Sequence, residues 1–182
     1  MPQKDIRSKK LLFFFDILDT NKNGVIQSDD FIMVADKIGE ALQSQREALI
    51  TMRFKATRFY VQLVQDMGKQ GVNIDRSEWL NFFLRIEETG YANKYVMHTS
   101  AYIFMLFDQN NDKMISRKEY ANMFQIYNID QHYIDQAFDK LDTNKDGTIS
   151  LRELINAFRE FLLSEDSDSP GNWIFGDWRS EV

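Results

Sequence analysis

Residues 142–153 read DTNKDGTISLRE, and this stretch decides the fold of the chain. Side chains that carry oxygen stand at alternate positions and again at the end, so a short loop can turn several of them toward one point. Calcium is a hard cation that takes six to eight oxygen ligands, and this spacing suits it. Gly147 provides the sharp turn, which a side chain would hinder. The predicted ligands are Asp142, Asn144, Asp146, the backbone carbonyl of Thr148, Ser150 and Glu153.

The same spacing, D-x-[DN]-x-[DN]-G-x5-E, defines an EF-hand loop, and a search backward along the chain finds it again. Residues 108–119 repeat it with Lys113 where glycine is usual. That position needs a positive φ, which costs a residue with a side chain roughly 1–2 kcal/mol. Three carboxylates gain enough from an ion to offset this cost, so we expect a calcium site here. Its predicted ligands are Asp108, Asn110, Asp112, the carbonyl of Met114, Ser116 and Glu119.

Residues 19–30 form a further version of the loop, closed by Asp30 in place of glutamate. Aspartate is one methylene shorter, so its two oxygens reach the ion less easily and a six-oxygen site is favoured. Magnesium demands a small octahedral site, and we expect it to compete with calcium most strongly here. With only two carboxylates among its six ligand positions, this loop should be the weakest or most magnesium-tolerant of the three. Its predicted ligands are Asp19, Asn21, Asn23, the carbonyl of Val25, Gln27 and Asp30.

A degenerate copy at residues 67–78 has lost the ligand chemistry. Met67, Lys69 and Gly71 occupy its first, third and fifth positions, and the lysine ammonium would repel a cation. Glu78 at the last position cannot hold calcium alone. We therefore predict that this hand is structural and that the chain binds three calcium ions.

The segments that flank the loops support four complete helix–loop–helix units. The eighth loop position holds isoleucine in every copy, and a β-branched residue there suits a short strand contact between paired loops. Apolar residues recur at i, i+3 and i+4 beside the loops, which is the pattern of one buried stripe per helix. We predict an all-α fold of four EF-hands and eight helices, in two pairs packed into one compact body. The four isoleucines are Ile26, Ile74, Ile115 and Ile149.

These units divide the chain into three parts. Residues 1–90 form an N-terminal pair with one active and one silent hand, and residues 91–163 form a C-terminal pair in which both hands are active. The polar stretch SEDSDSPG at 164–171 leads into NWIFGDW at 172–178, which is too apolar for a free end. Since exposed apolar patches usually find a partner, we expect the tail, 164–182, to pack back against the body.

Composition and charge narrow the function. The 182 residues carry 22 basic and 28 acidic side chains, and this net charge of −6 argues against a nucleic-acid partner, which requires a basic face. There are no cysteines, His98 and His132 are isolated, and no catalytic triad or P-loop occurs, so we expect no enzymatic activity. No apolar run approaches the roughly 18 residues that span a bilayer. We expect a cytoplasmic monomer.

Taken together, the sequence resembles the sarcoplasmic calcium-binding proteins of invertebrates and their relative calexcitin. The likeness rests on four hands with a silent second one, on Asp30 closing the first loop, on the stretched first half, and on the Trp-Ile-Phe-Gly motif at 173–176. The resemblance implies a compact fold with two EF-hand pairs packed face to face and a tail that closes the cleft. It also implies a role as a cytosolic calcium and magnesium buffer.

Two other functions stay open at this point. A sensor would expose a hydrophobic groove on binding calcium and capture a helix of a target protein. The eight methionines are scattered and the Phe-rich faces suit permanent burial, so the sequence favours a buffer. Coelenterazine-binding proteins share the architecture of the family, which leaves a small-ligand carrier as the further alternative.

Overall fold

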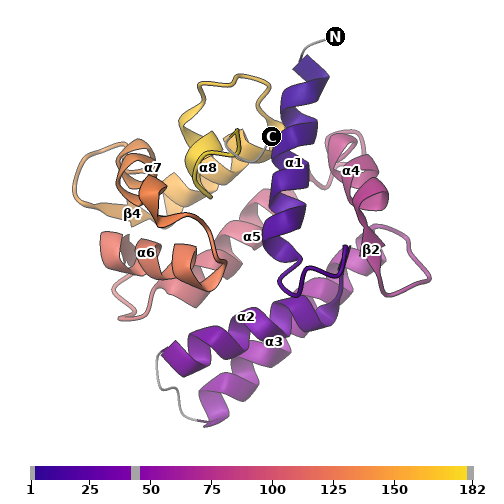
Figure 1. Cartoon of the computed structure of the whole chain (residues 1–182), viewed down its shortest axis with the longest axis horizontal. Helices are drawn as coiled ribbons and strands as arrows, with labels where there is room; N and C mark the ends of the chain where they lie inside the picture. The colour runs from indigo at the N-terminus through magenta and orange to yellow at the C-terminus, as the bar shows by residue number, and fades with distance from the viewer. Residues whose placement is uncertain (1–2, 42–45, 180–182) are drawn as a thin grey trace.

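The computed structural model describes residues 3–41 and 46–179. Within them, eight α-helices form four helix–loop–helix units, which confirms the predicted all-α EF-hand fold (Figure 1). None of the described helices is long and apolar enough to cross a membrane. The helices are α1 (Gln3–Leu18), α2 (Ser28–Ala41), α3 (Arg46–Asp66), α4 (Arg76–Leu84), α5 (Ala92–Phe107), α6 (Arg117–Ile126), α7 (Ile134–Leu141) and α8 (Leu151–Leu163), with short 3₁₀ helices η1 (Gln131–Tyr133) and η2 (Pro170–Trp173).

Two short antiparallel ladders join the loops in pairs, as predicted. The isoleucines at the eighth loop position face each other, Ile26 opposite Ile74 and Ile115 opposite Ile149, and all four are buried. Each ladder therefore couples the two loops of one pair. The strands are β1 (Val25–Ile26) with β2 (Ile74–Asp75), and β3 (Met114–Ser116) with β4 (Thr148–Ser150).

Helices α2 and α3 account for the stretched first half of the chain. α3 runs for 21 residues and packs along α2, and the two lie side by side at the lower end of the view (Figure 1). Gly39 of α2 allows this close packing, because a Cβ there would meet the Leu49 side chain at 2.8 Å. Arg53 of α3 adds an ion pair with Asp36 of α2, with Nε and Oδ1 2.5 Å apart. The extra length between the first two loops is thus a helical hairpin.

Aromatic side chains from distant parts of the chain meet in the core. The ring of Phe14 in α1 lies 5.6 Å from that of Trp79 in α4 and 5.6 Å from that of Phe158 in α8, measured between centroids. Phe175 of the tail stacks on Phe14 at 5.0 Å with an interplanar angle of 15°. Such ring pairs add to the apolar area that they bury. The first helix therefore joins both halves and the tail in one core.

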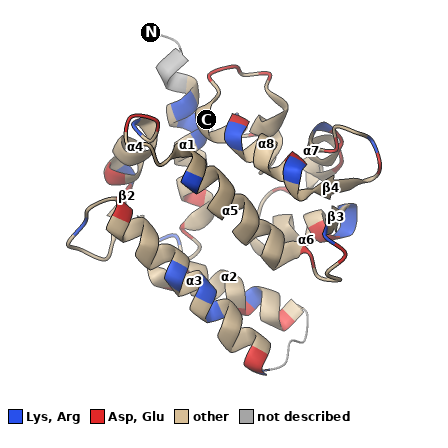
Figure 2. Cartoon of the chain, turned by 180° about the vertical axis from the view of Figure 1, so that it is seen from behind, with Lys and Arg blue, Asp and Glu red and all other residues tan. Residues whose placement is uncertain are grey.

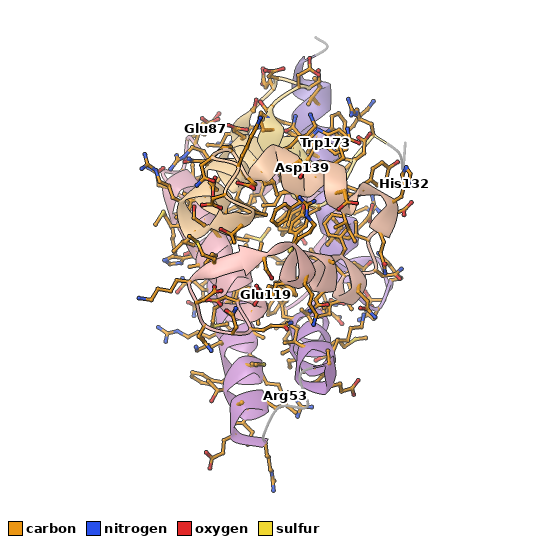
Figure 3. The ribbon with its side chains drawn as sticks, turned by 90° about the vertical axis from the view of Figure 1, so that its left-hand side faces the viewer. Arg53, Glu87, Glu119, His132, Asp139 and Trp173 are labelled. Atoms are coloured by element: carbon orange, nitrogen blue, oxygen red, sulfur yellow. The ribbon has the colours of Figure 1, made fainter. Side chains whose placement is uncertain are left out.

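The tail packs closely against the C-terminal hands. The Tyr120 hydroxyl in α6 donates a hydrogen bond to the Ile174 carbonyl at 3.0 Å. Gly171 lies so near α8 that a Cβ would come within 2.2 Å of the Ala157 carbonyl oxygen, so a larger residue would displace the tail. Trp173 lies above α6 in the side view, next to the labelled Asp139 of α7 (Figure 3). The buried apolar residues of the tail are Trp173, Ile174, Phe175 and Trp178.

Lys10 of α1 forms buried hydrogen bonds that hold the tail against α8. Its side chain is fully buried, and its Nζ donates to the carbonyl oxygens of Glu160 and Ser164 at 3.2 and 2.7 Å and to Asn172 Oδ1 at 2.7 Å. A cation suits this place because the carbonyl end of a helix carries partial negative charge. Burial, and secondly the charge of Arg7, lower the pKa of Lys10 to about 8. Lys10 thus links α1, the end of α8 and the tail.

Candidate metal centres

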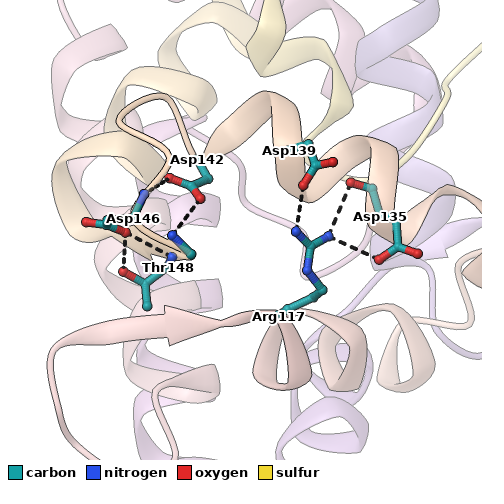
Figure 4. Close-up of polar contacts among 7 residues, drawn as sticks. Arg117, Asp135, Asp139, Asp142, Asp146 and Thr148 are labelled. Carbon is teal, nitrogen blue, oxygen red and sulfur yellow. Dashed lines mark hydrogen bonds and ion pairs between the residues drawn. The ribbon is translucent and has the colours of Figure 1, made fainter.

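The fourth loop draws its carboxylates inward with its own N–H groups (Figure 4). Asp142 follows α7 directly and accepts from the N–H of Asp146 at 3.1 Å and of Gly147 at 2.9 Å. Asp146 accepts from the N–H and the hydroxyl of Thr148 at 2.9 and 2.7 Å. Gly147 has a φ of 86°, which glycine adopts without strain. Hydrogen bonds within the loop therefore hold the carboxylates of the first and fifth positions inside it.

Glu153 closes this loop from the first turn of α8. Its Oε1 accepts from the N–H groups of Thr143 and Asn144 at 3.0 and 3.3 Å, and its Oε2 accepts from the N–H of Ser150 at 2.9 Å. Ser150 also caps α8 by accepting from the Glu153 N–H, so the two residues form a capping box. One carboxylate thus spans both sides of the loop, as two-oxygen binding of an ion requires.

The third loop repeats this hydrogen bonding despite Lys113. Lys113 adopts the positive φ that its position requires, 68°, and its N–H donates to Asp108 Oδ2 at 3.1 Å. Glu119 accepts from the N–H of Gln109 at 2.9 Å on one side and of Ser116 at 2.8 Å on the other. The second oxygen of Asp108, Oδ1, is buried and has no hydrogen-bond partner among the described residues. A carboxylate oxygen can only accept, so a bound cation would satisfy it, and this loop fits calcium.

The first loop reaches the same arrangement with a shorter closing residue. Asp30 Oδ1 accepts from the N–H of Asn21 at 3.2 Å, and Asp30 Oδ2 accepts from the N–H of Gln27 at 2.8 Å. Asp19 at the first position accepts from the N–H of Gly24 at 2.9 Å. Because α2 begins at Ser28, its first turn carries Asp30 far enough into the loop to bridge both sides.

The closing carboxylates differ in proton affinity. Burial raises the pKa of Asp30, the charge of Asp19 adds to the increase, and hydrogen bonds from the loop oppose it. Burial also acts to raise the pKa of Glu119 and Glu153, but their hydrogen bonds to serine and to loop N–H groups outweigh it, so both lie below the usual value. A proton therefore competes with a cation more strongly at the first loop than at the other two.

The second loop contains a lysine side chain that pairs with its closing carboxylate. Lys69, at the third position, forms an ion pair with Glu78 at the closing position. Glu78 also accepts from the N–H of Asp75 at 2.9 Å, which caps α4. The chain enters this loop through a positive φ of 66° at Gly68, its second position, and so follows a different path. The ammonium of Lys69 therefore neutralises the carboxylate at the closing position.

The predicted ligand positions fall in the same order in the three other loops. The first directly follows a helix, the third and fifth lie in the turn, the seventh begins a strand, the ninth precedes the next helix, and the twelfth lies in its first turn. The described part of the chain contains no cluster of three or more His, Cys, Asp or Glu side chains placed to hold a metal by themselves. The loops instead combine acids with amide, hydroxyl and backbone oxygens.

The left-handed backbone conformation at the fourth position of the first, third and fourth loops was not predicted from the sequence. Its φ is 59° at Lys22, 57° at Asn111 and 59° at Lys145. Only Asn111 signals this in the sequence, because asparagine visits the left-handed region more readily than other residues with a Cβ. In the first and fourth loops this turn directs the N–H groups of the fifth and sixth positions at the carboxylate of the first.

Arg117 connects the third hand to the fourth (Figure 4). It begins α6, and its guanidinium pairs with Asp135 at 3.0 Å and Asp139 at 2.6 Å, both on α7. The guanidinium carbon also lies 4.2 Å from the centroid of the Phe138 ring. These contacts between α6 and α7 add to the β3–β4 ladder, so the two C-terminal hands are joined at two places.

Comparison with known sequences agrees with this geometry. The profile of the EF-hand domain pair matches residues 97–159, and that of a single EF hand matches residues 14–35. Calerythrin of Saccharopolyspora erythraea is 29% identical over 164 residues, which cover 86% of this chain and 92% of calerythrin.

Solved structures share the complete fold. The coelenterazine-binding protein of Renilla muelleri, in its calcium-loaded apo form, superposes with a TM-score of 0.77 at 20% identity, over 97% of this chain and 98% of that one. The sarcoplasmic calcium-binding protein of amphioxus superposes with a TM-score of 0.75 at 17% identity, over 95% and 97%.

The fold and the loops define an EF-hand calcium-binding protein. Within this class the chain is similar in sequence to calerythrin and in fold to the sarcoplasmic calcium-binding protein of amphioxus, in agreement with the family that its sequence resembles.

Proposed function

We propose that the chain is a monomeric cytoplasmic buffer for calcium and magnesium, with metal sites in loops one, three and four. The packed tail is the observation that carries this proposal. Phe175 stacks on Phe14 at 5.0 Å and is 1% exposed, so the chain itself covers the apolar faces that a sensor would offer to a target. Sensor EF-hands work by opening such faces, whereas buffers open little.

The hydrogen bonding of the loops supports three sites. In each of the three loops, the closing carboxylate already bridges both sides, through Asp30, Glu119 or Glu153. The ion pair of Lys69 with Glu78 supports a second hand without metal, because calcium would have to displace an ammonium from the closing carboxylate of a loop that lacks acids at its first, third and fifth positions.

The first loop supports a role for magnesium. Asp30 brings one oxygen to each side of a small loop, and among the other predicted ligand positions only Asp19 is a carboxylate. A smaller octahedral cage with fewer charges discriminates less against magnesium than the other two loops do. We therefore assign the magnesium-tolerant site to the first loop.

A calorimetric titration of the metal-free protein tests this proposal. Calcium is added with and without millimolar magnesium, while Nile red, an uncharged dye, reports exposed apolar surface. A buffer gives three sites, weakened by magnesium, with little dye uptake. Phe175→Ala, which loosens the tail, is the control for a dye signal. Strong calcium-dependent dye uptake by the unaltered protein would overturn the buffer and favour the sensor.

A small-ligand carrier receives less support. The interior cavity between the two halves is lined by aromatic residues that include Phe14, Phe59 and Tyr102. Its volume is about 20 Å³, which is room for about one water molecule. A ligand of several rings would have to displace these side chains from the core.

A further inference from the structure

A groove runs along α3, between this helix and α5. It consists of two adjoining hollows with volumes of about 360 and 300 Å³, which share Lys55 and Met105 in their linings. α3 lines the groove from Glu47 to Gln62, a length of about 22 Å at 1.5 Å per residue. None of the lining residues belongs to the three ligand-bearing loops.

The floor of the groove is apolar. The rings of Phe59 on α3 and Tyr102 on α5 stack at 5.1 Å with an interplanar angle of 17°. Ala101, Met52 and Met105 extend this surface. Methionine side chains adapt to the shape of a partner, and aromatic rings anchor it, so such a floor suits recognition of apolar side chains.

The rim of the groove is cationic, although the protein is acidic. Lys55 and Arg58 are exposed, and neither pairs with a carboxylate in the described part of the chain. Lys94 and His98 of α5 lie on the opposite side, but Lys94 pairs with Asp66 at 2.5 Å, so Lys55 and Arg58 carry the positive charge of the rim that no described carboxylate neutralises. Lys and Arg occupy the outward face of α3, with acidic residues near its two ends (Figure 2). Among the described residues, Glu47 is the only acid that lines either hollow.

Large apolar side chains are exposed on both edges of the groove. Phe54 is 66% exposed, Ile50 56% and Val61 45%, and they form one stripe of α3 beside the groove because they are spaced by four and seven residues. Met97, on α5, is 47% exposed. These are four of the seven large apolar residues that are exposed in the described chain. A small ligand in the groove would leave them in water, whereas a longer partner would cover them.

We propose that this groove docks an amphipathic helix of a partner protein whose flanks are acidic. Its apolar stripe would lie on Phe59 and Tyr102, and its carboxylates would face Lys55 and Arg58. A helix of about 15 residues matches the length of about 22 Å, and an apolar helix face in an apolar groove is a common mode of recognition. A flat anionic membrane cannot fill a concave groove, and the net charge of −6 would be repelled by it.

This docking goes beyond the buffering role and does not depend on it. The groove lies between the entering helices of the second and third hands and is open while the core is closed. We therefore expect the same affinity with and without calcium. A buffer held in this way would bind calcium next to its partner.

The test uses two fluorescein-labelled helical peptides of 16 residues. Both carry leucine at i, i+3, i+4 and i+7, one has glutamate on the flanks, and the other has lysine in place of every glutamate. Fluorescence anisotropy should show the acidic peptide binding at least about tenfold more tightly than the basic one. Its affinity should fall as NaCl rises from about 50 to 500 mM and change less than about twofold between calcium and EGTA.

Variants of the protein locate the site. Lys55→Glu with Arg58→Glu should weaken the acidic peptide at least about tenfold. Lys118→Glu with Arg85→Glu makes the same change in net charge at exposed cations outside the groove and should leave affinity within about twofold. Phe54→Ser should weaken binding about threefold or more, while its urea unfolding stays unchanged because Phe54 is exposed.

Four results would overturn the proposal. They are equal affinity for the two peptides, equal losses in the two double variants, no binding of the acidic peptide at millimolar protein, and binding to anionic phosphatidylserine vesicles without binding to the peptide. The last would assign the surface to a membrane.

Discussion

Lys113 allows the energetic cost of the loop backbone to be measured. It adopts a φ of 68° where the first and fourth loops have glycine at 85° and 86°. A residue with a Cβ is destabilised by about 1–2 kcal/mol in this conformation, whereas glycine adopts it without strain. Glycine gives back about 0.5–1 kcal/mol of this difference, because its unfolded chain has more conformational entropy to lose on folding. Lys113 is exposed, so its side chain contributes little else. Lys113→Gly should therefore raise the free energy of unfolding by about 0.5–1 kcal/mol, or about 1–4 °C in midpoint.

The reciprocal substitution isolates the dihedral angle. A Cβ on Gly147 would meet no atom within 4 Å, so Gly147→Ala introduces the strain without a clash. It should lower the free energy of unfolding by about 0.5–1 kcal/mol. Both variants are compared by urea unfolding in excess EDTA, so that metal binding does not add to stability. A loss of stability in Lys113→Gly would refute the reasoning, because it would show that the lysine makes contacts worth more than the strain.

Three further predictions concern the closing carboxylates and the buried lysine. Glu153→Gln should reduce the calorimetric calcium count from three to two, whereas Glu78→Gln should leave it at three; a loss of one site in both would place a metal in the second loop. Lys69→Ala should add no site, because it supplies no ligand, and should cost less than about 1 kcal/mol, since its partner Glu78 is partly exposed; a fourth site in the titration would contradict this. The folded pKa of Lys10, about 8, lies below its ordinary 10.5, so the unfolded chain binds more protons between these values, and the free energy of unfolding should rise by about 1 kcal/mol from about pH 8 to 9.5. Urea unfolding at several pH values should show this rise in the unaltered protein and not in Lys10→Met, and a rise that persists in the variant would assign it to another group.

The features that the sequence predicted are those with a local cause. The spacing of oxygen side chains fixes each loop within a short stretch, and the isoleucine that follows it fixes the register of the ladder, with Ile115 opposite Ile149 as expected. The positive φ of Lys113 was predictable because Asp108 and Glu119 fix its place in the loop. Helix boundaries followed because each loop dictates where one helix ends and the next begins.

The features that the sequence did not predict depend on distant contacts. Lys10 reads as an ordinary charge on a helix, and its three acceptors lie at least 150 residues further along the chain. From the sequence, Lys69 was interpreted only as a lost ligand that repels a cation. The spacing of residues does not show that its ammonium pairs with Glu78 of the same loop. The groove beside α3 escaped notice because Phe54 and Phe59 look alike in sequence, and only packing decides which one is exposed.

The position of Lys10 links the metal sites to the closed core. α1 ends at Leu18, directly before the predicted ligand Asp19, while α8 carries Glu153 in its first turn and has at its other end the carbonyls that Lys10 binds. A movement that opened either hand widely would therefore pull the tail away from Phe14. Exposing a buried phenylalanine costs about 1.5–3 kcal/mol, and several rings meet there. This cost opposes opening, and we therefore expect the proposed buffer to keep its core closed when it binds ions.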